Sequence, residues 1–309
     1  MDTALAVRAR GITKSFSDVV ALDCVDLDVA EGQVHGLVGP NGAGKTTLLG
    51  LLLGLAAADE GSLEILGRPA GRGFAVPAGV SGFVDGPGLY PSLTARQNLA
   101  ALAALSSRDT RTGRIDDVLA ELGLSDVAGD RVRGFSLGMR QRLGLAAALL
   151  TQPRLVVLDE PSNGLDPAGR KHVHRVLTQL AADGTAVVLS SHRMDDLELL
   201  CSEVTILATG RVVFSGPLSK LSAESRELDY RLVTSDSRAA GELILATPGI
   251  SLAHGSGEGT LVVRAPAPAL DELVARLVRA GIALRELAPV VSPLEAAFLA
   301  LTEPQEASR

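Results

Sequence analysis

Two kinds of hydrophobic pattern occur along this chain, and the first is strict alternation. Near the N-terminus, Asp26 and Asp28 alternate with Val25, Leu27 and Val29. A period of two places successive side chains on opposite faces, so this stretch predicts a β-strand with one buried face. Strands with one face open to water are typical of antiparallel sheets. We therefore expect antiparallel strands in the N-terminal part of the chain.

The second pattern is a set of short and almost continuous apolar runs. QVHGLVG at 33–39, RLVVLDE at 154–160 and TAVVLSS at 185–191 all end in small or acidic residues. Such runs are typical of parallel strands that are covered on both faces. Helical stretches lie between them, at 138–150 and 170–184. Strands that alternate with helices predict an α/β parallel-sheet core, whose ligands bind at the carboxyl ends of the strands.

The pattern changes twice more along the chain. Between 85 and 135, apolar helical stretches are separated by polar linkers with no clear strand, which predicts an inserted helical subdomain over about 86–150. VTILATGRVVFSG at 204–216 predicts a hairpin, and KLSAESREL at 220–228 then indicates a domain boundary. We expect a large domain over 1–221 and a small C-terminal α+β domain over 222–309.

The C-terminal domain has strand and helix patterns but no catalytic motif. LDYRLVT at 228–234 predicts a strand, 237–247 a short helix, and 250–266 two strands around a Gly-rich turn. The last helix begins at Ser292-Pro293-Leu294-Glu295, where a capping Ser is followed by Pro at the first helical position and by Glu three residues after the cap.

Composition and charge exclude several classes of protein. Of the 309 residues 46% are hydrophobic, yet the longest apolar run, at 47–58, is far shorter than the roughly 20 residues that cross a bilayer. The N-terminus does not resemble a signal peptide. A net charge of −7 argues against a general nucleic-acid surface. Cys24 and Cys201 stand alone among aliphatic residues, and we interpret them as buried thiols in a reducing cytoplasm rather than as a disulfide.

A phosphate-binding loop is the strongest chemical motif. In GLVGPNGAGKTTLLG, Gly39, Gly44, Lys45 and Thr46 match G-x-x-x-x-G-K-[ST] between an apolar strand and an apolar helix. Glycines let the backbone N–H groups wrap around phosphate, and the helix N-terminus adds positive charge. Lys45 would reach the β- and γ-phosphates of ATP, and the Thr46 hydroxyl would bind Mg²⁺.

A pair of acids follows the second of the buried runs. RLVVLDEP ends in Asp159 and Glu160, and two carboxylates at a strand end are unfavourable unless they face a cation or exchange a proton. Asp159 would hold Mg²⁺, and Glu160 would act on the attacking water as general base. A strand that ends in Asp-Glu is weak evidence alone, but it becomes strong downstream of a phosphate loop.

With these motifs the chain resembles the nucleotide-binding subunit of an ABC transporter over about residues 5–220. That family carries a signature segment upstream of the acids, which reads FSLGMRQRL here, with Leu137 where Gly is usual and Met139 where Gln is usual. The resemblance implies that Ser136 and Gly138 meet a γ-phosphate across a dimer. The resemblance also supplies a role for the clustered arginines at 131–143, which could otherwise indicate a nucleic-acid-binding patch.

The resemblance assigns the remaining site residues. It implies that the loop after the acids contacts the partner subunit through Asp166, that His192 holds the γ-phosphate, and that Phe16 stacks on adenine rather than lying in the core. His172 and His174 have no such context, so we expect them to be solvated helix residues. The implied ATP site consists of Phe16, Gly39, Pro40, Asn41, Gly42, Ala43, Gly44, Lys45, Thr46, Thr47, Ser136, Gly138 and Gln141.

Asp85, in SGFVDGPGLYP at 81–91, stands where the family normally has a Gln that senses Mg²⁺ and the attacking water. A subgroup that resembles bacitracin and lantibiotic exporters often has Glu there. A carboxylate can meet Mg²⁺ but cannot donate a hydrogen bond as an amide can. We expect Asp85 to be a metal-linked catalytic residue that couples the ATP state to the partner, and the alternative is a solvated turn cap.

The resemblance implies a cytoplasmic ATPase that needs ATP and Mg²⁺ and works as a homodimer or heterodimer. It would power a separate multi-spanning permease on the inner face of the membrane, for efflux of antibiotics, drugs or peptides. Two alternatives stay open. One is an ATPase without a permease that acts on nucleic acid or ribosomes, although the long insertions, second ATPase unit and metal-ligand spacing common in such relatives are missing here. The other binds ATP without hydrolysis, against which Glu160 and His192 argue.

Overall fold

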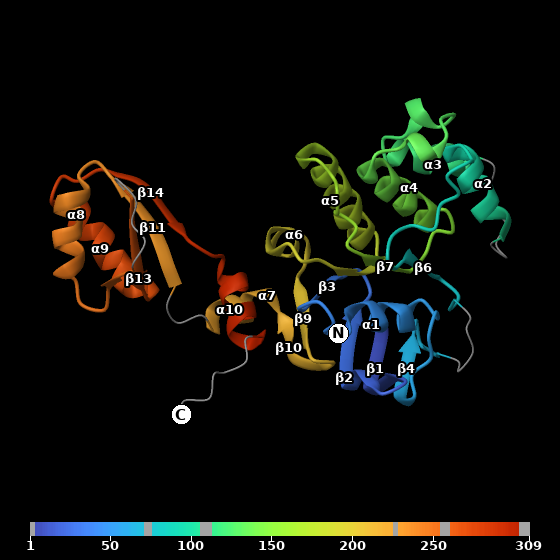
Figure 1. Ribbon diagram of the computed structural model, residues 1–309, viewed down its shortest axis with the longest axis horizontal. Helices are drawn as coiled ribbons and strands as arrows, with labels where there is room; N and C mark the ends of the chain where they lie inside the picture. Colours follow the sequence, from blue (N-terminus) through green and yellow to red (C-terminus); the bar gives the residue numbers. More distant parts are fainter. Residues whose placement is uncertain (1–3, 71–75, 106–112, 225–227, 254–259, 303–309) are drawn as a thin grey trace. The chain divides into compact units, whose positions relative to one another are not determined.

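A computed structural model of the protein describes residues 4–70, 76–105, 113–224, 228–253 and 260–302. The chain divides into two compact units, residues 1–217 and 218–309 (Figure 1). The second unit begins with helix α7 (Leu218–Glu224), inside which the sequence placed its boundary. The whole of α7 belongs to the second unit because it packs against the last helix, α10 (Pro293–Thr302).

A six-stranded sheet forms the centre of the first unit, in the order β10-β9-β3-β8-β7-β6. Adjacent strands of this sheet are parallel except at one edge, where β10 is antiparallel to β9 in the hairpin predicted from the sequence. The strands are β3 (Val34–Val38), β6 (Val80–Phe83), β7 (Leu155–Asp159), β8 (Ala186–Ser190), β9 (Glu203–Ala208) and β10 (Arg211–Pro217). Every residue of β3, β7 and β8 is buried, which confirms the prediction of covered parallel strands.

The N-terminal strands form a separate antiparallel sheet in the order β2-β1-β4-β5, as expected from their alternation. They are β1 (Leu5–Phe16), β2 (Val19–Ala30), β4 (Glu60–Ile65) and β5 (Arg68–Pro69). Val25, Leu27 and Val29 point into the core while Asp26 and Asp28 are exposed. The expectation of two buried thiols was wrong for Cys24. It has a φ of 52° and is exposed, because an irregular pairing of β1 with β2 interrupts the alternation there, whereas Cys201 is buried.

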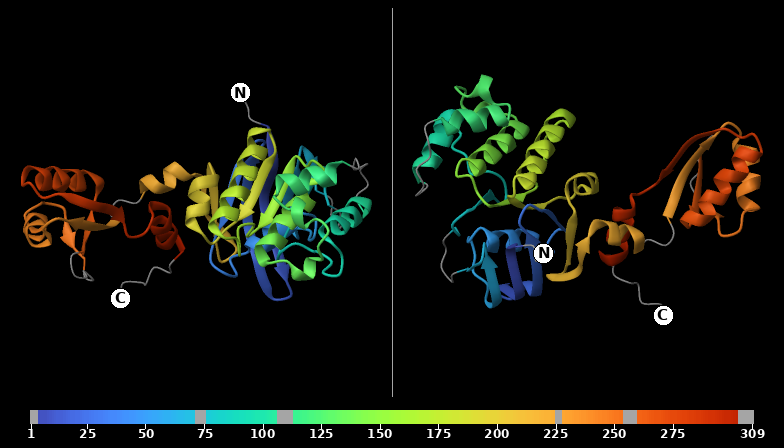
Figure 2. Two further views of the ribbon diagram at one scale, coloured as in Figure 1. Left: turned by 90° about the horizontal axis from the view of Figure 1, so that it is seen from above. Right: turned by 180° about the vertical axis from the view of Figure 1, so that it is seen from behind.

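The helices of the first unit fall into two groups. A helical region contains α2 (Ala95–Leu105), α3 (Arg114–Glu121) and α4 (Leu137–Leu149), with the short 3-10 helices η1 (Ser125–Val127) and η2 (Val132–Gly134). The other helices follow strands of the central sheet and are α1 (Lys45–Leu52), α5 (Pro167–Ala182) and α6 (Met194–Leu200). The helical region and the antiparallel sheet lie at opposite ends of this unit, as both figures show (Figures 1 and 2).

The second unit contains its own sheet and core. An antiparallel sheet in the order β12-β13-β11-β14 packs against α8 and α9 through an apolar cluster that includes Leu232, Ile244 and Leu273. The elements are β11 (Leu228–Thr234), α8 (Ser237–Leu245), β12 (Ser251–Leu252), β13 (Thr260–Ala265), α9 (Ala267–Arg279) and β14 (Leu284–Pro289). The Gly-rich turn expected between the strands at 250–266 lies outside the described residues. Ser292 caps α10 as predicted, since its hydroxyl accepts a hydrogen bond from the Glu295 N–H at 3.2 Å.

Candidate functional site

The phosphate loop joins the end of β3 to the first residue of α1. Gly42 and Gly44 have φ values of 80° and 101°, in the left-handed region that favours glycine. A Cβ atom on Gly39 would lie 2.4 Å from the Leu207 carbonyl oxygen, and one on Gly44 would lie 2.4 Å from that of Ala21. The loop is thus packed against β9 and β2 so closely that these two positions accept only glycine. The remaining loop residues, Pro40, Asn41 and Gly42, are exposed, and Ala43 is buried.

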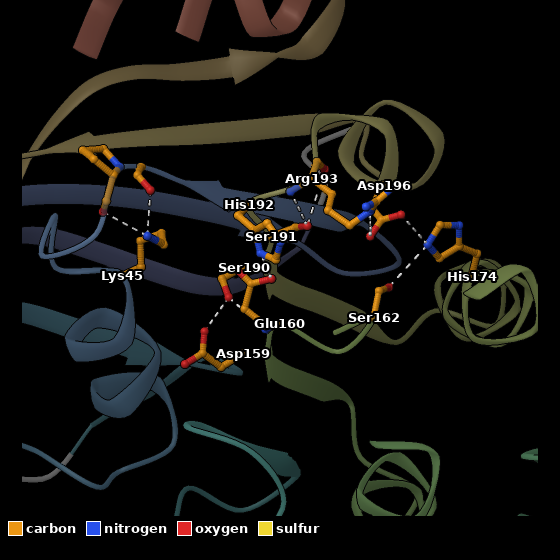
Figure 3. A network of polar contacts seen from close by, with 12 residues as sticks. Lys45, Asp159, Glu160, Ser162, His174, Ser190, Ser191, His192, Arg193 and Asp196 are labelled. Carbon is orange, nitrogen blue, oxygen red and sulfur yellow. Dashed lines mark hydrogen bonds and ion pairs between the residues drawn. The ribbon is translucent and has the colours of Figure 1, made fainter. Parts of the chain in front are cut away.

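Lys45 is the first residue of α1, and its side chain turns back toward the loop. Its Nζ donates hydrogen bonds to the carbonyl oxygens of Gly39 at 2.7 Å and Pro40 at 3.1 Å (Figure 3). Burial lowers the pKa of Lys45, and the charges of Glu160 and Asp159 oppose this shift. Two carbonyl oxygens of the loop therefore hold the lysine ammonium, and the charges of both acids act on it.

Asp159 ends β7 and is buried among donors from three other elements. Ser190, at the end of β8, donates its hydroxyl hydrogen to Asp159 Oδ1, while Thr46 Oγ1 and the Asp85 N–H lie 3.4 and 3.3 Å from Oδ2. Ser190 also accepts a hydrogen bond from the Glu160 N–H at 3.0 Å. One fully buried serine thus holds both acids, and Asp159 in turn connects β7 to α1 and to the loop after β6.

Glu160 directly follows β7 with a φ of 50°, an uncommon conformation for a residue other than glycine. Its Oε2 lies 2.7 Å from Nδ1 of His192, which follows β8 by two residues (Figure 3). The His192 side chain is 64% exposed, so the acid and the imidazole meet at the surface of the sheet edge. The structure therefore brings together Lys45, Asp159, Glu160 and His192, four of the residues that the sequence selected.

Asp85 follows β6 with a φ of 57° and an exposed side chain. It lines a cleft of about 470 Å³ together with Arg140, Gln141, Asn163 and the two acids. Its backbone contact with Asp159 places the loop after β6 directly beside the acid pair. The geometry is that of a residue facing the site, and its carboxylate is accessible from the cleft.

The signature residues lie at the start of α4, in the helical region. Ser136 is the N-cap of α4 and accepts a hydrogen bond from the Met139 N–H at 3.2 Å, so within one chain its hydroxyl caps its own helix. Gly138 is buried, and a Cβ atom there would lie 3.1 Å from the Gly164 carbonyl oxygen. Gln141 is buried, and its Oε1 has no hydrogen-bond partner among the described residues.

Phe16 ends β1 and is 52% exposed, so the core alternative for this ring was wrong. The Nζ of Lys14 lies 5.3 Å from the ring centroid, at a distance typical of a cation–π contact. Asp59 accepts hydrogen bonds from Lys14 Nζ and from the Ser15 N–H, both at 2.7 Å. The aromatic ring is therefore presented at the surface by a fixed strand end.

Sequence reasoning missed several polar residues behind this edge. His172 and His174 are not solvated as expected: His172 Nε2 lies 2.7 Å from the Glu121 carbonyl oxygen, and His174 pairs with Asp196. Ser190 was missed as well, because a serine at a strand end has no local signal of its role. Within the described ranges, no group of three or more His, Cys, Asp or Glu residues could hold a metal ion. The expected Mg²⁺ ligands instead combine the Thr46 hydroxyl with carboxylates.

The carboxyl edge of the central sheet is that of a P-loop ATPase, and the separate helical region with its capped α4 is typical of the ABC class. The chain matches the ABC transporter family over residues 22–163. YhcH, an uncharacterized ABC transporter ATP-binding protein of Bacillus subtilis (strain 168), is 33% identical to it over 98% of this chain and 97% of its own length. The chain therefore belongs to the ABC transporter ATP-binding proteins, which bind and hydrolyse ATP.

Other relatives carry more specific names. The daunorubicin resistance ATP-binding protein DrrA3 of Streptomyces coeruleorubidus is 35% identical over 97% of this chain and 96% of its own length. The bacitracin transport ATP-binding protein BcrA of Bacillus licheniformis is 36% identical over 73% of this chain and 74% of its own length. The comparisons give no support to an ATPase that acts on nucleic acid or ribosomes.

Solved structures show the same fold in the first unit. The ATP-binding subunit of an ABC transporter gives a TM-score of 0.64 at 27% identity, covering 71% of this chain and 92% of that chain. A dimeric ATP-binding cassette in a post-hydrolysis state with ADP and phosphate gives a TM-score of 0.61 at 23% identity, covering 69% and 98%. Both support the predicted fold class. In the part of the chain that the structure describes, no helix is long and apolar enough to cross a membrane.

Proposed function

We propose that this protein is the ATPase subunit of an exporter and powers a separate membrane permease that expels antibiotics, drugs or related peptides. The observation that carries the ATPase part is the Lys45–Asp159–Glu160–His192 arrangement at one sheet edge. The export part rests on whole-length similarity to a daunorubicin resistance protein and on similarity to a bacitracin transport protein. Because ABC ATP-binding subunits generally pair with permeases, this chain would act at the inner face of the membrane, on the cytoplasmic side.

The proposed chemistry assigns one task to each residue. The N–H groups of residues 41–47, at the loop and the start of α1, bind the phosphates, and Lys45 leaves the Gly39 and Pro40 carbonyl oxygens to meet the terminal phosphate. Glu160 accepts a proton from the attacking water, and His192 holds the terminal phosphate beside it. Phe16 provides the exposed ring on which adenine stacks.

The residues present fit a magnesium ion. Thr46 Oγ1 and Asp159 Oδ2 lie 3.4 Å apart, and hydroxyl and carboxylate oxygens are the ligands that Mg²⁺ prefers. Asp85 would add a second carboxylate, directly or through water. When bound, the ion would neutralise charge on the phosphate oxygens.

A dimer would complete the site. Ser136 and Gly138 belong to the start of α4, whose N–H groups and positive end of the helix dipole suit a phosphate from a second subunit. Because one chain carries both the phosphate loop and the α4 start, a homodimer would have two complete sites. The C-terminal unit, residues 218–309, would be an accessory domain of this ATPase.

The hydrolysis proposal is tested by phosphate release from the purified full chain with Mg²⁺ and ATP. Glu160→Gln should reduce the rate by about 100-fold or more while ATP still binds, because Gln keeps the shape but cannot accept the proton. Glu198→Gln makes the same change at an exposed carboxylate of α6, is the matched control and should hydrolyse at the wild-type rate. If Glu160→Gln retained the wild-type rate, the assigned base would be wrong.

The coupling role of Asp85 needs a separate experiment on the ATPase together with its permease. Asp85→Ala should leave ATP binding nearly intact, because the phosphate loop is untouched, and should uncouple hydrolysis from efflux. The measurement is drug export by the ATPase with its copurified permease, against Asp85→Glu as the conservative variant. Transport at the normal rate in Asp85→Ala would overturn this role.

The permease proposal is tested by purification of the tagged chain from gently solubilised membranes of its own cells. A multi-spanning protein recovered in near-equal amount supports the transporter. Recovery of ribosomes or DNA instead would overturn the export proposal and leave the ATPase in place.

A further inference from the structure

Asp196, in α6, is a buried carboxylate that the proposed chemistry does not use. Its side chain is 2% exposed, and its Oδ1 lies 3.2 Å from Nε2 of His174 in α5 (Figure 3). Its Oδ2 lies 3.8 Å from Nε of Arg193 and has no hydrogen-bond partner among the described residues. Removing a carboxylate from water is unfavourable unless partners compensate it, so a carboxylate buried here with one oxygen unpartnered points to a role.

Hydrogen positions in this cluster follow from the chemistry of its members. Nε2 of His174 faces both Asp196 Oδ1 and, at 3.5 Å, the hydroxyl of Ser162. An ionised carboxylate only accepts, so Nε2 carries the hydrogen and the Ser162 oxygen is a second, weaker acceptor. Burial lowers the pKa of His174, against the opposing charge of Asp196, while Arg170 and Arg193 lower it further. At neutral pH the imidazole is therefore neutral, with its hydrogen on Nε2.

The cluster is not a Ser–His–Asp catalytic triad. In a triad the acid and the serine engage different ring nitrogens, so that the imidazole can pass a proton between its two sides. Here both partners lie on Nε2. A nucleophilic role for Ser162 is excluded on that geometry, and what remains is a structural connection between α5, α6 and the loop after β7.

The two ends of the cluster adjoin the two residues of the proposed reaction. Ser162 lies two residues after Glu160, and Arg193 directly follows His192. The Arg193 N–H also donates to the hydroxyl of Ser191 at 3.0 Å, which closes the turn that carries His192. A single buried carboxylate therefore has contacts that lead to both loops, and these loops must hold the Glu160 and His192 side chains 2.7 Å apart.

We propose that Asp196, acting with His174, is a positioning residue that keeps the His192 loop in register with the Glu160 loop; this rests on the ATPase function proposed above. Neither Asp196 nor His174 is among the residues assigned to the nucleotide. The pair fixes the start of α6 against α5, and through Arg193 and Ser162 it sets the separation of the base and the imidazole. Because a displacement of about 1 Å at a reacting group can lower a rate about 100-fold, loss of the pair should affect turnover more than binding.

The test compares variants of the full chain in ATP hydrolysis across ATP concentration. Asp196→Leu replaces the carboxylate by an apolar group of the same branched shape, and His174→Leu removes the donor. His174→Gln keeps an N–H donor for Asp196 and is the conservative variant. Glu198→Leu removes an exposed carboxylate from the same helix and is the matched control. Thermal unfolding of each variant shows whether it is folded.

The expected result is a kcat lowered about 10- to 100-fold in Asp196→Leu and His174→Leu, with the KM for ATP within about twofold of wild type. His174→Gln should recover most of the activity, and Glu198→Leu should equal wild type. The double variant Asp196→Leu/His174→Leu should lose no more than either single variant, since the pair acts as a unit.

Two results would overturn the inference while the ATPase function stood. One is a kcat within twofold of wild type in folded Asp196→Leu or His174→Leu. The other is a loss that His174→Gln does not reverse, or that comes with lower thermal stability and an equal rise in KM, as a merely structural role would give. If Asp196→Leu did not fold, the two His174 variants would decide. A wild-type chain that hydrolysed no ATP, with or without its permease, would instead overturn the proposed function and this inference with it.

Discussion

Ser190→Ala is the substitution whose effect follows most directly from the structure. Ser190 is fully buried, donates a hydrogen bond to Asp159 Oδ1 and accepts one from the Glu160 N–H. Alanine keeps the backbone and removes both bonds. Asp159 retains its contacts at Oδ2, with Thr46 and the Asp85 N–H, so the variant should fold.

The magnitude follows from the two bonds that are lost. A hydrogen bond to a charged group contributes about 1.5–3 kcal/mol, and one between neutral groups about 0.5–1.5 kcal/mol. The sum gives a loss of roughly 2–4.5 kcal/mol in the free energy of unfolding of the first unit. Because Asp159 and the Glu160 backbone both lose a fixed partner, kcat for ATP should fall about tenfold or more as well.

The assay is urea unfolding of the full chain, followed by ATP hydrolysis of the same samples. Ser190→Cys is the control, because it fills the same space with a weak donor and acceptor. It should be nearly as destabilised as Ser190→Ala if the bonds matter, and close to wild type if only packing does. A destabilisation below about 0.5 kcal/mol in Ser190→Ala would refute the reasoning that this serine holds the two acids.

Three further predictions concern other parts of the first unit. Phe16→Ala should weaken ATP binding by about 1–3 kcal/mol, seen as a raised Kd in calorimetry, whereas Phe16→Tyr should bind normally. Gly39→Ala should abolish ATP binding in the same measurement, because the added Cβ would lie 2.4 Å from the Leu207 carbonyl oxygen. Gly50→Ala is its control, because a Cβ added there would meet no atom within 4 Å outside its own stretch of helix. Burial lowers the pKa of His35 to about 4, so the unfolded imidazole, with a pKa of 6.5, binds a proton that the folded one does not. The free energy of unfolding should therefore fall as the pH drops from about 6.5 to 4, by up to about 3 kcal/mol from this residue, and His35→Gln should lack that part of the decrease in urea titrations.

Much of the site was predictable because its signals are local. The phosphate loop needs glycine at fixed places in a strand–loop–helix segment, and that segment is contiguous in sequence. Asp159 and Glu160 were found because a buried strand ends in two carboxylates. Outside the site, Ser292 was correctly predicted as a helix cap because the capping motif spans only four neighbouring residues.

Other features were not predictable because they arise between distant segments. His174 and Asp196 are separated along the chain and meet only because α5 and α6 pack together. Cys24 was expected to be buried from its aliphatic neighbours, but an irregularity in the pairing of β1 with β2 turned it outward. A side chain's exposure depends on the register of its partner strand, which no local pattern records.

By itself the sequence determined which strands are buried, where the phosphate loop lies and which carboxylates end a strand, because periodicity and residue type act within a few positions. Tertiary structure alone decided what surrounds those carboxylates. The order β8-β7 in the sheet pairs Asp159 with Ser190 in register, and this pairing puts a hydroxyl beside both acids. It also puts His192 beside Glu160, since the residues that follow two adjacent parallel strands emerge at the same edge.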